Sequence, residues 1–248
     1  MKAERRHELK INSLSWTLQQ LPETAKKYQS QIALVLVLAA VAVLLVRYRS
    51  NSAQQRVAEA RQSLGIAGED LRQLESIAPY PGADLQMVMR KREDIYSDGL
   101  QQADQVLQKA AESQAALKAQ ALILKGDFNF DMANFPDLPG AATQPSLQPA
   151  ESAESLLSNA ADAYTQVLQN YASDKSAVTA AHFGLAAVAE NRGAWNDAKT
   201  QYQAIVDGDA EAPYKVLASM RLAILPQLEE PVAMDVSAAT QPSSRPAK

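Results

Sequence analysis

Hydrophobic residues are unevenly distributed along the chain, and their longest uninterrupted run lies near the N-terminus. All fifteen residues from Ile32 to Val46 are apolar. A buried helix of a water-soluble domain normally keeps a polar face, and this run has none. The pattern therefore predicts a membrane span, represented by Ile32, Leu36, Val41 and Val46.

The length of the span is set by the residues that flank the run. A bilayer core about 30 Å thick needs roughly 20 helical residues, and Tyr28 and Tyr48 bracket a segment of that length. Tyrosine rings favour the depth of the lipid headgroups. The sequence thus predicts a transmembrane helix over residues 28–48.

The charges beside the span bear on its orientation and its processing. Six Lys or Arg and three Glu precede it in residues 1–31, and Arg47, Arg49, Arg56 and Arg61 follow it. The positive-inside rule favours a cytoplasmic N-terminus. A preceding region of this length is long for a cleaved signal peptide, so an uncleaved anchor is expected.

The N-terminal tail, residues 1–27, combines basic residues with a short apolar stripe. Leucine and isoleucine recur at spacings of 3 and 4, which is typical of an amphipathic helix. Such a helix could lie on an anionic membrane surface or dock on a partner, and a solvated basic flank is the alternative. The stripe consists of Ile11, Leu14, Leu18 and Leu21.

Residues 49–78 keep a regular 3, 4 alternation of apolar positions and are predicted to form a stalk helix. Gly65 and Gly68 each weaken a helix by up to about 1 kcal/mol. The stalk could therefore pack on the following domain or associate with a second copy. A Pro-Tyr-Pro-Gly sequence at 79–82 ends it, and the next helix is expected to start near Asp84.

Two segments have a composition that predicts no packed structure. Residues 136–150 and 226–248 are rich in Pro, Ala, Ser, Thr and Gln, and both contain the hexamer AATQPS. Such segments bury too little apolar area to offset chain entropy. The first is expected to be an inserted surface loop and the second a disordered tail.

An internal repeat indicates the fold class. One set of three apolar positions recurs with an offset of 38, from Ala160, Tyr164 and Val167 to Ala198, Tyr202 and Ile205. An Ala-x-x-x-Leu-Ala pattern recurs with an offset of 37, from Ala181 to Ala218. A shared period of this size predicts stacked helical hairpins, in which small residues allow close crossings and rings fill the gaps. The expected fold is all-α.

The order of residue types in the second hairpin resembles the tetratricopeptide signature. Leucine, a small residue, the inter-helix glycine, alanine and an aromatic ring follow one another at Leu185, Ala186, Gly193, Ala198 and Tyr202. The chain departs from the signature at three positions, where a tryptophan, a tyrosine and an alanine are usual. These positions hold His182, Ala189 and Ile205.

Together with the anchor and the basic opening MKAERRHELKINSL, this order resembles the bacterial family of membrane-anchored tetratricopeptide-like proteins that includes the ancillary subunit of the SecYEG translocon. The resemblance implies a single span in the inner membrane and a cytoplasmic N-terminus. It also implies a periplasmic repeat domain, here residues 84–225, that contacts the translocon, periplasmic chaperones or translocating chains.

Composition and motifs favour no enzymatic or cofactor chemistry. The chain has no cysteine, two histidines and a net charge of −4, so no disulfide or thiolate site is expected and nucleic acid is an unlikely partner. His182 has no nucleophile motif beside it, and we interpret it as a packing residue. Asp127, Asn129 and Asp131 have the opening spacing of a calcium loop but lack its glycine and its bidentate glutamate.

Three phenylalanines cluster just before the inserted loop, at Phe128, Phe130 and Phe135. They could close the end of the hairpin core, or they could form an aromatic anchor for a bound partner. Taken together, the sequence predicts a membrane-anchored scaffold for protein–protein interactions, without catalytic, cofactor or metal residues. The alternative is a structural component that self-associates as a homo-oligomer in an envelope complex.

Overall fold

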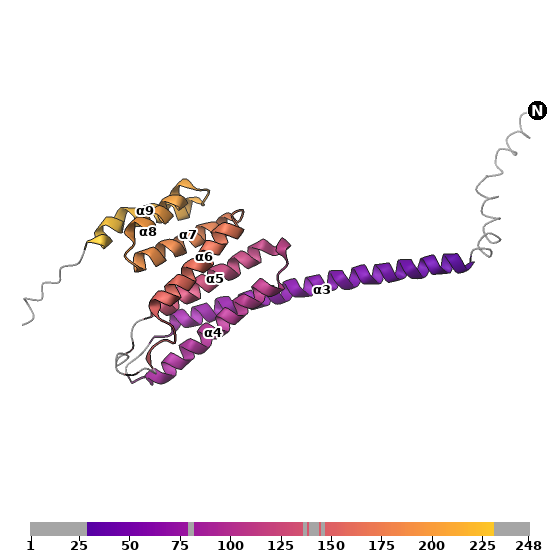
Figure 1. Cartoon of the computed structure of the whole chain (residues 1–248), viewed down its shortest axis with the longest axis horizontal. Coiled ribbons are helices and arrows are strands. Elements are labelled where there is room, and N and C mark those ends of the chain that lie inside the picture. Colours follow the sequence, from indigo (N-terminus) through magenta and orange to yellow (C-terminus); the bar gives the residue numbers. More distant parts are fainter. Residues whose placement is uncertain (1–28, 79–81, 136–137, 139–143, 145–146, 231–248) are drawn as a thin grey trace, which may run out of the picture. The chain divides into compact units, whose positions relative to one another are not determined.

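The computed structural model describes residues 29–78, 82–135, 138, 144 and 147–230, and every element among them is a helix (Figure 1). The all-α expectation is confirmed for this part of the chain. The predicted tail at 1–27, Tyr28 and residues 231–248 lie outside it. The helices are α3 (Gln29–Ser76), α4 (Leu85–Lys109), the 3-10 turn η1 (Glu112–Gln114), α5 (Ala115–Ala133), α6 (Ala153–Asn170), α7 (Lys175–Asn191), α8 (Trp195–Asp207) and α9 (Ala212–Glu229).

Helix α3 is continuous through the predicted span and the predicted stalk. It contains a stretch long and apolar enough to cross a membrane, and none of that stretch is buried within the structure. Tyr48 is 74% exposed, and Leu36, Val41 and Val46 are exposed as well. The side chain of Ile32 is not among those described. A compact unit that ends at Gln55 contains the apolar half of α3, and a second unit begins at Arg56.

The second half of α3 belongs to the helical domain. Ala60, Ala67 and Leu74 are buried at seven-residue intervals. Ala60 shares a core cluster with residues of α4 and α5, and Ala67 and Leu74 share another with Phe128. Of the two arrangements that the stalk pattern allowed, the structure shows packing on the following domain.

Helix α4 begins where the sequence predicts. The Asp84 carboxylate accepts hydrogen bonds from the backbone N–H groups of Gln86 and Met87 at 3.0 and 3.2 Å, which satisfies two of the free donors at the helix start. A charged residue, Arg92, lies on the buried face of α4 among apolar residues. The buried residues are Met89, Arg92, Gly99, Ala103 and Val106.

Parts of the two segments expected to be structureless are ordered. Leu138 and Leu147 are each 3% exposed and pack with Met132 and Leu156. The surface-loop prediction is wrong for these two residues, because average composition hides isolated leucines that anchor a segment. The predicted end of the domain at 225 is also wrong, since α9 continues through Pro226.

Helices α4 to α9 run up and down in chain order, joined by short turns except between α5 and α6 (Figure 1). Aromatic rings that pack against glycines hold neighbouring helices together. A Cβ atom added at Gly99 would overlap the Phe128 ring, and one added at Gly126 or Gly184 would overlap the Tyr164 ring. The Tyr164 ring is therefore enclosed by glycines from the helices on either side of α6.

We expect Gly126→Ala and Gly184→Ala to lower the free energy of unfolding by about 1–3 kcal/mol, because the ring has no room to move aside. Gly68→Ala is the matched control: it lies inside a helix with open space around it, and the change should stabilise by roughly 0.5–1 kcal/mol. Urea unfolding of the full chain in detergent micelles measures both. Equal effects at Gly68 and Gly126 would show that the close approach is unimportant.

Candidate functional site

The residues predicted to pack between repeats lie in two core clusters. The first contains Ala160, Tyr164 and Val167, with Leu185 partly buried against it. The second contains Ala186, Ala198, Tyr202 and Ile205. Gly193 lies in the turn between α7 and α8 with a φ of 67°, a conformation that favours glycine.

The two repeated tyrosines have equivalent polar partners on the preceding helix. The Tyr164 hydroxyl donates to Asp127 Oδ1 at 2.7 Å, and the Tyr202 hydroxyl donates to Glu190 Oε1 at 2.8 Å. Arg221 of α9 donates to the other oxygen of Glu190 at 2.8 Å. Each ring thus fills a crossing and also ties its hydroxyl to the neighbouring helix. The repeat with an offset of 38 residues identified the two tyrosines. It did not identify their carboxylate partners, because Asp127 and Glu190 lie at different distances along the sequence from their tyrosines.

The three phenylalanines have different environments. Phe128 is fully buried, so its ring belongs to the core. Phe130 is partly buried and packs against the first core cluster. Phe135 is also partly buried, and its ring centroid lies 2.9 Å from the guanidinium carbon of Arg92. The core interpretation accounts for Phe128, whereas Phe135 lines a cavity.

That cavity, near the C-terminal end of α5, has a volume of about 350 Å³ and is formed by α3, α4 and α5. Arg92 is 1% exposed, and its Nε and Nη2 atoms have no hydrogen-bond partner. None of the ion pairs between described residues involves Arg92. Sequence reasoning missed this residue, because arginine on an otherwise apolar stripe is ordinarily read as a surface position. The cavity is lined by Leu74, Glu75, Ile77, Ala78, Arg92, Asp131, Asn134 and Phe135.

The electrostatics near the cavity follow from burial. Burial lowers the pKa of Arg92 to about 9 against the opposing effect of Glu93 and Asp131. Burial also raises the pKa of Asp131 to about 6, with Glu75 and Asp127 acting in the same direction and the charge of Arg92 acting against it. The pKa of Asp127 is likewise raised by burial to about 6, although the hydrogen bond from Tyr164 opposes the shift.

The residues with calcium-loop spacing lie on helix α5 rather than in a loop. Asn129 accepts a hydrogen bond from the Tyr96 hydroxyl at 2.9 Å and donates to the Lys125 carbonyl at 2.7 Å. The Asp127 carboxylate accepts a hydrogen bond from the Tyr164 hydroxyl. These side chains therefore serve helix packing. Among the described residues, no group of three or more His, Asp or Glu could hold a metal ion.

His182 and Ala189, two positions at which the chain departs from the tetratricopeptide signature, have different surroundings in the structure. His182 lines a hollow of about 240 Å³ between α7 and the end of α8, and its Nδ1 lies 2.8 Å from Gln201 Oε1. Ala189 is in the second core cluster. A different hollow of about 280 Å³ lies between α3, α5 and α7, where Leu64, Ile123, Leu124 and Ala177 make it largely apolar.

Helix α9 carries the main apolar surface of the helical domain. It packs on α8 through Ala218 and Leu225, while a second stripe faces solvent. Leu217, Met220, Ile224 and Leu228 recur at spacings of 3 and 4, so they share one helix face. The exposed large apolar residues of α9 are Tyr214, Val216, Leu217, Met220, Ile224 and Leu228.

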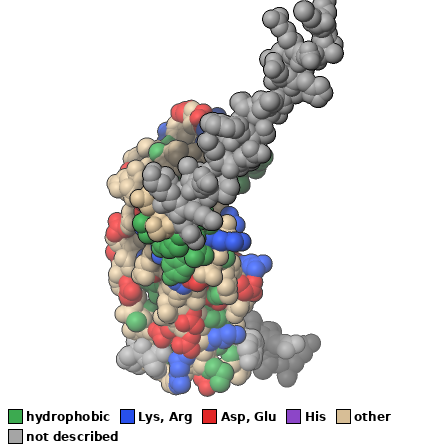
Figure 2. All heavy atoms as spheres, turned by 90° about the vertical axis from the view of Figure 1, so that its right-hand side faces the viewer, with side chains coloured by type: hydrophobic (Ala, Val, Ile, Leu, Met, Phe, Trp, Pro, Cys, Tyr) green, Lys and Arg blue, Asp and Glu red, His purple; other side chains and the backbone are tan. Residues whose placement is uncertain are grey.

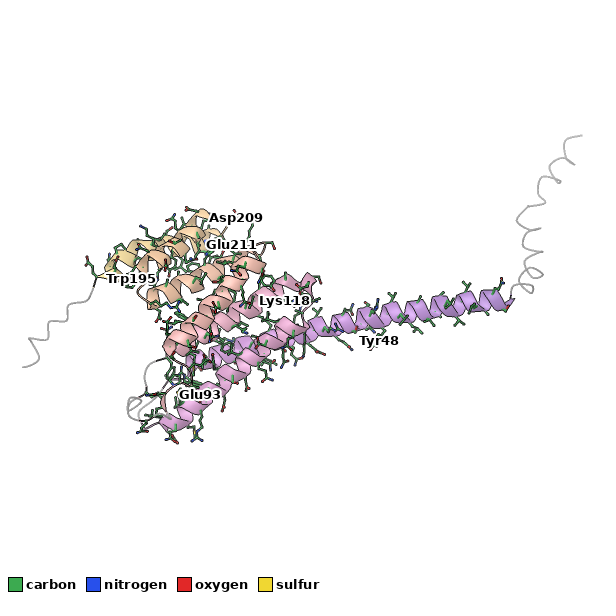
Figure 3. The ribbon with its side chains drawn as sticks, in the orientation of Figure 1. Tyr48, Glu93, Lys118, Trp195, Asp209 and Glu211 are labelled. Atoms are coloured by element: carbon green, nitrogen blue, oxygen red, sulfur yellow. The ribbon has the colours of Figure 1, made fainter. Side chains whose placement is uncertain are left out.

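Outside α9, the large apolar side chains exposed on the described part of the helical domain are Ile66 and Met87. On the face shown in Figure 2, acidic and basic side chains are interspersed rather than gathered by sign. Figure 3 shows Asp209 and Glu211 in the turn between α8 and α9, where Asp209 pairs with Lys175 at 3.0 Å. Exposed pairs of this kind add little stability. Comparison with protein-family models, curated proteins and solved structures finds no match for this chain.

The raised pKa values near the cavity predict a pH dependence of stability. Because Asp131 has a pKa of about 6 in the fold, above the ordinary value of 3.8, the folded chain binds more protons between these values. Its contribution to the free energy of unfolding should therefore increase as the pH falls from 7 towards 4.

We expect Asp131→Asn to stabilise the protein at pH 7.5 and to have a much smaller effect at pH 4.5, where the aspartate is itself neutral. Urea unfolding at the two pH values measures the difference. Asp162→Asn, at an exposed position on α6, controls for the loss of one negative charge. A stabilisation by Asp131→Asn that is equal at both pH values would contradict the burial argument.

Proposed function

We propose that the protein is a single-pass membrane scaffold whose helical domain binds other proteins. The observation that carries this proposal is the pairing of an unburied apolar helix with a helical domain whose last helix exposes an apolar stripe. Monomeric soluble proteins rarely expose large contiguous apolar patches, and those that do often use them for binding.

The helix order and the repeated ring positions support a tetratricopeptide-like solenoid for the domain. In such arrays each helical pair buries its apolar face against the next, and the terminal unit normally has a polar outer face. Here the terminal helix, α9, keeps an apolar outer stripe. A partner helix laid against α9 would continue the stack and bury that stripe.

The membrane, topology and partners follow from the resemblance to membrane-anchored tetratricopeptide-like proteins. We propose an N-terminus in the cytoplasm, a span in the bacterial inner membrane and a periplasmic domain that serves protein translocation or periplasmic chaperones. The apolar run, without a polar face, supports the anchor, and the basic N-terminal tail supports the orientation.

Removal of residues 29–48 should release the chain from washed membranes into the soluble fraction, because the unburied apolar side chains are then gone. Removal of residues 231–248 is the control and should leave the chain in the membrane. A reporter fused after Lys248 should be active in the periplasm. Activity confined to the cytoplasm would overturn the proposed topology.

The double substitution Leu217→Glu and Met220→Glu should reduce crosslinking of partners to the helical domain by at least about tenfold, because it buries two charges in any apolar interface on α9. Gln166→Glu with Gln169→Glu, at exposed positions on α6, adds the same charge and should have no effect. Chemical crosslinking in membranes followed by mass analysis measures both.

The same experiment tests the structural alternative, because the exposed stripe of α9 could also accept a second copy of the chain. Crosslinked bands at multiples of the protomer mass that disappear in the α9 variant would favour self-assembly. Bands that contain other proteins would favour the scaffold. Crosslinking unchanged by the α9 variant would remove this helix from the proposal.

A further inference from the structure

The cavity at the end of α5 contains a buried cation that the fold leaves unpaired. Arg92 is 1% exposed, and two of its donor nitrogens, Nε and Nη2, have no hydrogen-bond partner. Its third nitrogen, Nη1, lies 3.9 Å from the sulfur of Met89, which is a weak acceptor. A buried charged donor without an acceptor is costly, so its retention calls for a reason beyond packing.

The ring of Phe135 does not supply the missing acceptors. Its centroid lies 2.9 Å from the guanidinium carbon, so the ring covers the flat face of the group. The N–H bonds of a guanidinium point outward in its plane, and a ring above that plane leaves them unbonded. Phe135 directly follows Asn134, the C-terminal cap of α5.

The unpaired atoms indicate the chemistry of a ligand. Nε and Nη2 form the edge of arginine that binds the two oxygens of a carboxylate in parallel. Glu75 and Asp131 line the same cavity and would repel a ligand that is only anionic. They would instead accept hydrogen bonds from an N–H group close to the carboxylate. A cavity of about 350 Å³ is at the small end of ligand sites.

We propose that this cavity binds an amino-acid carboxylate with its adjacent nitrogen, held by Arg92 on one side and by Asp131 and Glu75 on the other. The two donor nitrogens of Arg92 are closed off from solvent in the structure. Phe135 is therefore the gate: its ring, stacked on the flat face of the guanidinium, holds that group in place, and its release lets the Nε and Nη2 edge turn towards the carboxylate. This site is separate from the α9 stripe and does not depend on the docking role.

Two sources share this chemistry: a free amino acid, and the C-terminal residue of a peptide. Calorimetric titration of the full chain in detergent micelles with glycine, acetyl-Gly-Gly and acetyl-Gly-Gly-amide distinguishes them. We expect binding in the low millimolar range for at least one of the two carboxylates. Tighter binding of glycine identifies a free amino acid, and tighter binding of acetyl-Gly-Gly identifies a peptide C-terminus.

The amide lacks the carboxylate and should bind at least about tenfold more weakly than acetyl-Gly-Gly, the factor expected when a hydrogen-bonded charge is removed. Arg92→Met should weaken binding of the carboxylates by a similar factor. It replaces the buried cation by an apolar side chain of similar length, which proteins often tolerate. Arg90→Met, at an exposed position on the same helix, is the control and should bind as the unchanged protein does.

Phe135→Ala provides the second, independent variant. Removing the gate should tighten binding, because no ring then holds the guanidinium in place. The proposal is overturned if neither carboxylate binds, if the amide binds as well as the acid, or if Arg92→Met keeps its melting temperature and its affinity. Should Arg92→Met fail to fold, unchanged or weaker binding by Phe135→Ala overturns the proposal on its own.

Discussion

The packing of aromatic rings directly on helix backbone is the constraint on which the helical domain depends. A ring reaches the backbone of a neighbouring helix only where that helix has no side chain, and Gly99, Gly126 and Gly184 provide such places. Glycine inside a helix costs up to about 1 kcal/mol relative to alanine. The return for that cost is direct contact between the ring and the backbone of the neighbouring helix, which a Cβ atom would prevent. The hydroxyls of Tyr164 and Tyr202 add polar ties to the preceding helices, so the register of these pairs is fixed as well as their distance.

The sequence indicated those elements whose apolar positions have a clear period. The repeated rings, the cap at Asp84, the α3 pattern and the turn glycine Gly193 all follow from local spacing. The sequence did not indicate which glycines contact aromatic rings, because the residues around a helical glycine do not show which side chain of a neighbouring helix packs against it. Gly65 and Gly68 cannot be distinguished from Gly126 in the sequence, yet a Cβ atom added at either of them would have no neighbouring atom within 4 Å.

The candidate sites were less predictable than the fold for a related reason. Sequence patterns assign polar residues to the surface, so Arg92 was not recognised as a core residue, and the acids of α5 were noted only for an incomplete calcium-loop spacing. The surroundings of Arg92 and of the α5 acids depend on the packing of α3 and α4 against α5, which brings together residues distant in the sequence. Phe135 was noticed for its hydrophobicity, whereas its contact with Arg92 requires two helices to be in place. The apolar stripe of α9 was not identified from the sequence, and the structure shows which of its residues are exposed.

The anchoring of Leu138 and Leu147 has a consequence for how the segment between α5 and α6 can change. Both leucines pack into one cluster with Met132 of α5 and Leu156 of α6, so the chain between them is attached at each end. Each doubling in length of a flexible loop adds only about 0.6 kcal/mol of closure entropy. The stretch between the two leucines is therefore a place where the protein could acquire or lose residues, such as a duplicated hexamer, while the hairpin beneath keeps its shape.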